Sequence, residues 1–227
     1  MTQDDKSHLP FLTFGHSCHV DCGPVWVMFY HYTPAHIANI VCHILGGTLA
    51  IVAGLFAMVV RKRSKLHARA GMIFVWAYSL VIFTAVMGVL VFEFRSFLAV
   101  ATFASSYSLF SGYRATRLRG ERPTPLDVGA AVAGIAAPAL FIGAMHILQK
   151  PWAPVLTWTV LGSLIGVSSY DLLRAILPAG WLGATWIHEH IFKIISAFDA
   201  LTATFAATTF PHFNPGQQYF LTSLEMG

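Results

Sequence analysis

The sequence predicts an all-α integral membrane protein, a bundle of about six transmembrane helices. Of its 227 residues, 56% are hydrophobic and only 11% are charged, whereas soluble domains carry about 25% charged residues. A soluble fold cannot cover its surface with so few charges, but a lipid bilayer removes that requirement. Apolar runs close to 20 residues long, the length of a membrane-crossing helix, also recur along the chain.

Six runs are expected to span the membrane, with short polar loops between them. They cover residues 37–60, 72–92, 97–112, 128–148, 155–173 and 189–210, of which the third can extend to 115 and the sixth can begin near 181. The chain then divides into a polar and interfacial N-terminal tail (1–35), a transmembrane domain (36–212) and a C-terminal tail (213–227).

Basic residues indicate how these spans are oriented. The loops after the first, third and fifth spans hold most of the lysines and arginines, whereas the opposite side holds only Lys6, Arg95 and Lys150. Because cytoplasmic loops carry the excess of basic residues, both termini are expected outside the cytoplasm of a bacterial inner membrane. The formal net charge of +4 is therefore assigned to membrane orientation, and no nucleic-acid partner is expected.

The N-terminal tail contains a possible metal site. His16, Cys18, His19 and Cys22 form a His-x-Cys-His-x-x-Cys motif, and thiolate with imidazole suits copper(I) or zinc. A disulfide between Cys18 and Cys22 is the alternative interpretation.

Histidines inside the spans are the main candidates for chemistry. On the first span His43 shares a face with Gly47 and Gly54. The small residues are typical of close helix packing, but an ionisable group inside a span is costly and is a functional candidate. His67 lies at the cytoplasmic entrance of the second span, and His146 ends the fourth span on the outer side.

The sixth span holds two further histidines and a carboxylate. His188 and His190 are two residues apart, so on a helix only one of them can face the centre of the bundle. Asp199 lies on the face of His188. It is either a carboxylate that relays protons or a hydrogen-bonded structural residue.

The expected depths of these residues suggest a cofactor. His67 and His190 are expected near the cytoplasmic face, and His43 and His146 towards the outer face. Two imidazoles at matched depth on neighbouring helices are what a haem b needs as axial ligands. The candidate cofactor ligands are therefore His43, His67, His190 and His146, and the candidate metal ligands are His43, His67, His188, His190 and Asp199.

Three short motifs resemble a family of bacterial predicted membrane proteins without an assigned activity. They are residues 43–50 (His-Ile-Leu-Gly-Gly-Thr-Leu-Ala), 67–71 (His-Ala-Arg-Ala-Gly) and 190–196 (His-Ile-Phe-Lys-Ile-Ile-Ser). Lys193 and Ile194 depart from the Arg-Met pair of that family. The resemblance implies that His43, His67 and His190 act together. A looser similarity of architecture links the chain to cytochrome b561-type proteins.

Three functions remain open at this stage. The first is a redox protein that binds haem b or a transition metal (zinc, iron or copper) and carries electrons, with quinone or a respiratory complex as partner besides the lipid bilayer. The second is an accessory or assembly subunit of a larger membrane complex. The third is a zinc-dependent intramembrane hydrolase, which needs His43, His67 and His190 at one site with Asp199 or Glu189 as base.

Overall fold

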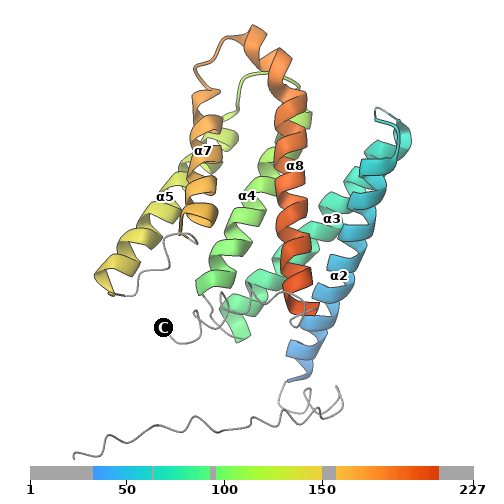
Figure 1. The fold of residues 1–227 in the computed structure, drawn as a ribbon, viewed down its shortest axis with the longest axis vertical. Helices are drawn as coiled ribbons and strands as arrows, with labels where there is room; N and C mark the ends of the chain where they lie inside the picture. Colours follow the sequence, from blue (N-terminus) through green and yellow to red (C-terminus); the bar gives the residue numbers. More distant parts are fainter. Residues whose placement is uncertain (1–32, 63, 93–95, 150–156, 210–227) are drawn as a thin grey trace, which may run out of the picture. The chain divides into compact units, whose positions relative to one another are not determined.

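The computed structural model describes residues 33–62, 64–92, 96–149 and 157–209. These residues form six α-helices and two short π-helices and contain no strand, so the predicted all-α class is confirmed (Figure 1). In chain order they are α2 (Pro34–Val59), α3 (Lys65–Met87), η2 (Gly88–Phe92), α4 (Ser96–Leu118), α5 (Pro125–Ile147), η3 (Thr157–Gly162), α7 (Ser163–Leu173) and α8 (Ala179–Thr209).

Each helix packs mainly against a small number of neighbours. α2 pairs with α3, α4 pairs with α8, and α5 pairs with α7. Further contacts join α3 to α4, α2 to α8, and α4 to α5. The connections α2–α3, α4–α5 and α7–α8 lie at the same end of this helical unit (Figure 1).

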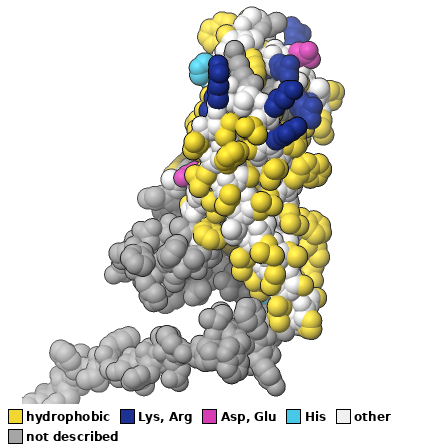
Figure 2. Space-filling view, turned by 90° about the vertical axis from the view of Figure 1, so that its right-hand side faces the viewer, with side chains coloured by type: hydrophobic (Ala, Val, Ile, Leu, Met, Phe, Trp, Pro, Cys, Tyr) yellow, Lys and Arg dark blue, Asp and Glu magenta, His cyan; other side chains and the backbone are white. Residues whose placement is uncertain are grey.

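Three helices are long and apolar enough to cross a membrane: Pro34–Val59, Lys65–Phe92 and Pro125–Ile147. Their outer faces expose large apolar side chains such as Leu49, Trp76 and Leu140. Lysine and arginine gather at one end of the face seen in Figure 2, and hydrophobic side chains cover most of the rest of its described part. The predicted membrane association is consistent with this pattern.

The observed helix ends differ from the predicted spans in two places that affect the site. α3 begins at Lys65 rather than at residue 72, because Ser64 caps the helix and its side chain accepts a hydrogen bond from the backbone N–H of His67. α8 begins at Ala179, close to the earlier start near residue 181 and ten residues before Glu189. His67 and the 188–190 segment are therefore helical, whereas His67 was expected in a loop.

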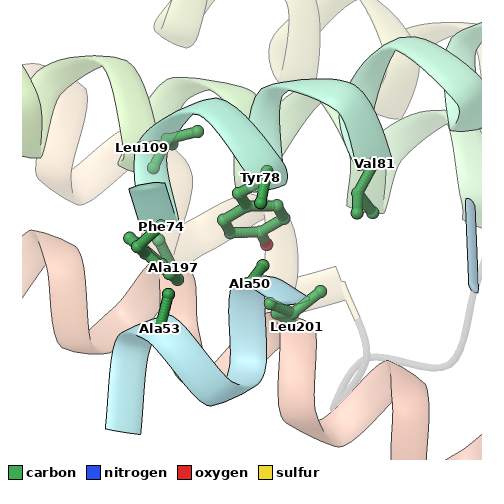
Figure 3. Close-up of a cluster of buried hydrophobic side chains, with 9 residues drawn as sticks. Ala50, Ala53, Phe74, Tyr78, Val81, Leu109, Ala197 and Leu201 are labelled. Atoms are coloured by element: carbon green, nitrogen blue, oxygen red, sulfur yellow. The ribbon is translucent and has the colours of Figure 1, made fainter. Parts of the chain in front are cut away.

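A buried cluster joins α2, α3, α4 and α8 (Figure 3). Small residues of α2 lie against aromatic residues of α3, with α4 and α8 closing the cluster. Its members are Ala50, Ala53, Phe74, Ala77, Tyr78, Val81, Leu109, Ala197 and Leu201. The small-residue face of α2 thus serves helix packing, one of the two interpretations that the sequence allowed.

Gly54 offers a direct test of this packing. A Cβ atom added there would lie 2.7 Å from the ring of Phe198 and 3.2 Å from Phe74. We expect Gly54→Ala to lower the free energy of unfolding by about 1–3 kcal/mol, the usual cost of overpacking. Thermal unfolding in detergent measures the change. Gly143→Ala is the matched control, since a Cβ there meets no atom within 4 Å, and it should leave stability unchanged or raise it.

Candidate functional site

Two histidines each use Nδ1 to reach a carbonyl oxygen of another helix. Nδ1 of His67 lies 2.9 Å from the carbonyl oxygen of Ala57 on α2. Nδ1 of His190 lies 3.1 Å from the carbonyl oxygen of Gly112 on α4. A carbonyl oxygen only accepts hydrogen bonds, so in both rings Nδ1 carries the proton and donates. Nε2 is therefore the nitrogen whose lone pair remains for a ligand.

His43 is held in the same way by a side chain. Its Nδ1 lies 2.8 Å from the hydroxyl oxygen of Thr84 on α3. That hydroxyl lies 3.0 Å from the carbonyl oxygen of Leu80 and 2.9 Å from that of Val81, to which it donates. The contact between Nδ1 and the hydroxyl group ties the ring of His43 to α3.

This arrangement is the one that metal-binding histidines use. Such residues donate one ring N–H to a carbonyl or carboxylate, which fixes the tautomer and the ring orientation, and they bind the metal through the other nitrogen. His67 and His190 both have this geometry, whereas the partner of His43 is a hydroxyl group; all three histidines are half-buried.

His67 and His190 lie in the same region. His67 lies in the first turn of α3 and His190 in the first half of α8, and the two imidazoles are near enough for a charge on one to act on the other. One turn beyond His67, on the same face of α3, a Cβ added to Gly71 would meet no other atom within 4 Å. Open space therefore adjoins the face of α3 that carries His67.

His43 lies far from this pair. His67 contacts α2 at Ala57, fourteen residues beyond His43, which corresponds to about 21 Å along a helix. His146 is exposed at the end of α5, and α5 packs on α4 and α7 whereas α2 packs on α3 and α8. The structure thus brings His43 together with neither His67 and His190 nor His146.

The exposed face of α8 carries the other two candidates. His188 and Asp199 share a face, as their spacing predicts, and both side chains are exposed. Neither belongs to the region of His67 and His190. Across the described ranges, no group of three or more His, Cys, Asp or Glu side chains could hold a metal ion. The motif of His16, Cys18, His19 and Cys22 lies outside the described residues.

A buried ion pair that the sequence interpretation missed lies next to His190. Lys193, one turn further along α8, pairs with Asp171 on α7. The Asp171 carboxylate also accepts hydrogen bonds from the hydroxyl groups of Tyr107 at 2.7 Å and Ser111 at 2.5 Å. Nζ of Lys193 donates to Ser111 as well, at 2.8 Å. This network joins α4, α7 and α8 beside the Gly112 carbonyl that orients His190.

A second buried ion pair joins the end of α7 to α8. Nε of Arg174 is 3.1 Å from a carboxylate oxygen of Glu189, and their side chains are 4% and 5% exposed. The other oxygen of Glu189 accepts from Tyr170 at 2.9 Å and from Thr185 at 3.0 Å. Arg174 was expected in a cytoplasmic loop, but it is buried where α7 ends.

Close approach of the helices makes both networks possible. A Cβ added to Gly112 would lie 3.0 Å from Ile194 and 3.1 Å from Lys193. In the turn after α4, Gly120 has a φ of +90°, and a Cβ there would lie 2.6 Å from the backbone of Gly183. A side chain at either position would push α8 away from α4.

A small pocket opens beside these networks, between α4, α5 and α7. Its volume of about 10 Å³ is enough for roughly one water molecule. At its outer side the Asp127 carboxylate accepts from Nε of Arg114 at 2.6 Å and from Nη2 at 2.7 Å. The lining residues are Tyr107, Phe110, Ser111, Arg114, Pro123, Asp127, Ala130, Asp171 and Arg174.

Comparison with known proteins adds no assignment: no protein family model, curated protein or solved structure matches this chain.

Proposed function

We propose that this protein is a redox protein of the bacterial inner membrane in which His67 and His190 bind a haem b or a single transition-metal ion. Electrons would pass through that group, with quinol as the donor class. The zinc-hydrolase alternative requires His43 at the same place, and the separation of about 21 Å along α2 argues against it.

One observation carries the proposal: the donated Nδ1–H groups of His67 and His190. Each ring is anchored on a backbone carbonyl, at 2.9 Å and 3.1 Å. In each ring this bond leaves Nε2 as the nitrogen with a lone pair for a ligand. The matched anchoring on α3 and α8 supports a group that two imidazoles would hold better than a site of three ligands.

Individual residues of the chain would have distinct roles in holding the bound group. His67 and His190 hold the bound group through Nε2, while the Ala57 and Gly112 carbonyls fix the planes of the rings. Gly71 leaves room beside His67 for a flat ligand. A bound haem or metal would supply one-electron chemistry that no side chain provides.

The proposal includes six membrane spans with the Lys- and Arg-rich end in the cytoplasm. α4 and α8 have too many polar residues to be recognised as spans by hydropathy alone, and η3 with α7 (Thr157–Leu173) is shorter than 18 residues. Their buried charges, however, face one another: Asp171 with Lys193, and Arg174 with Glu189. Paired charges inside a bundle are compatible with a span.

Absorption spectra of the detergent-purified protein, oxidised and dithionite-reduced, test the proposal, with metal analysis of the same sample. We expect reduced haem bands or one stoichiometric metal ion. His67→Ala and His190→Ala should each remove the bound group, because loss of either ligand leaves a single imidazole.

The matched control is His188→Ala, two residues from His190 on the exposed face of α8, which should leave the spectrum and metal content unchanged. A featureless, metal-free sample from cells supplied with haem and metals would contradict the proposal and leave the accessory-subunit hypothesis ahead.

A further inference from the structure

The pocket between α4, α5 and α7 contains a buried donor without a partner. The Arg174 residue is 3% exposed, and its Nη2 atom forms no hydrogen bond. Its Nε atom lies within ion-pair distance of Glu189, 3.1 Å away, but does not form a hydrogen bond either. Buried guanidinium donors without partners are costly, and Arg174 lines the pocket.

The charges around the pocket favour an anionic group as the missing partner. The two carboxylates that line it are already neutralised, Asp127 by Arg114 and Asp171 by Lys193. The exposed residues Arg119 and Arg122 in the adjoining turn, with Glu121 between them, add a net positive charge. An acceptor that enters here would lie among the guanidinium groups of Arg174 and Arg114, since both residues line the pocket.

We infer that this pocket binds a phosphate group and that anionic lipid headgroups supply it. The pocket lies at the Lys- and Arg-rich end of the helices, where headgroups surround a membrane protein, and basic pockets between spans at that level bind anionic lipids. Its small volume admits one phosphate oxygen, while the rest of the headgroup stays among the exposed arginines. The inference does not depend on the histidine pair.

Native mass spectrometry of the full-length protein tests this inference. The probes are phosphatidylglycerol, diacylglycerol, which lacks the phosphate, and inorganic phosphate as competitor. We expect one tightly retained phosphatidylglycerol and no retained diacylglycerol. Arg174→Gln should weaken retention at least about tenfold, since a charged hydrogen bond is lost, whereas Arg61→Gln, an exposed substitution in the connection between α2 and α3, should leave this site unchanged.

Each outcome distinguishes the possible sources of the group. Competition by inorganic phosphate would support a site for the phosphate group itself, and retention without competition would support a site that also needs the lipid chains. Equal retention of phosphatidylglycerol by the wild type and by all arginine variants would overturn the inference. Its complete absence from the wild type would overturn the inference too and would indicate that the pocket holds a water molecule instead. If Arg174→Gln does not fold, Arg114→Gln takes its place, because Arg114 is partly exposed at 22%.

Discussion

Replacing Asp171 with asparagine is expected to destabilise the protein by about 3–5 kcal/mol, because it leaves the ammonium group of Lys193 buried without a counter-charge. The Lys193 side chain is 2% exposed and that of Asp171 is 7% exposed, so water cannot replace the lost carboxylate. Asparagine keeps a carbonyl oxygen in place, so Tyr107 and Ser111 can still donate to it. The loss is measured from thermal or denaturant unfolding in detergent.

A double variant separates the missing charge from a general loss of packing. In Asp171→Asn/Lys193→Met neither charge remains, and methionine fills most of the volume of the lysine chain. Removal of both members of a buried pair is often neutral or stabilising, so we expect the double variant to be more stable than Asp171→Asn alone. Asp199→Asn, on the exposed face of α8, should change stability by less than about 0.5 kcal/mol. A double variant no more stable than the single one would contradict the ion-pair account.

The positions of the helices could be predicted because apolar run length alone largely sets them. The interval 37–60 corresponds to Pro34–Val59, and 128–148 corresponds to Pro125–Ile147. The start of α8 was harder to predict, since Ala179 to His188 includes alternating small, polar and aromatic residues. Hydropathy cannot assign such a segment to loop or helix without its contacts on α4.

The physical rule that makes the histidines candidates applies equally to two charged residues that the sequence interpretation missed. An ionisable side chain inside a span is a functional candidate, and Asp171 and Lys193 satisfy that rule as fully as His43 does. Glu189, Lys193 and Ala197 recur every four residues on α8, so one helical face holds them, and all three are buried. That face was readable from the sequence, but Glu189 alone among its three members was a candidate, as a base, while His188 and Asp199 lie on an exposed face.

The pairing of the charges could not be read from the sequence. Lys193 meets Ser111, 82 residues away in the sequence, because α8 packs beside α4. Spacing along one helix shows which side chains share a face but not which other helix that face contacts. The anchoring of His190 on the Gly112 carbonyl depends on the same long-range contact.

Replacing Gly112 with valine is expected to weaken binding of the proposed cofactor by about 10–100-fold, the usual cost of disturbing the residues that orient a ligand. A Cβ at this position lies 3.0 Å from Ile194 and 3.1 Å from Lys193, so α8 must move away from α4. That movement lengthens the 3.1 Å contact that orients His190 and leaves the ligand itself in place. Titration of the metal or haem into the apoprotein, followed by its absorption, measures the affinity.

The effect on His190 must be distinguished from simple destabilisation of the α4–α8 contact. Gly54→Ala provides that comparison, because it overpacks the buried cluster near Phe198 without touching the Gly112 carbonyl. It should lower the unfolding temperature while cofactor affinity stays within about fivefold, the limit of a change below 1 kcal/mol. If Gly112→Val and Gly54→Ala weakened binding equally, the orientation of His190 by α4 would have no special part in holding the cofactor.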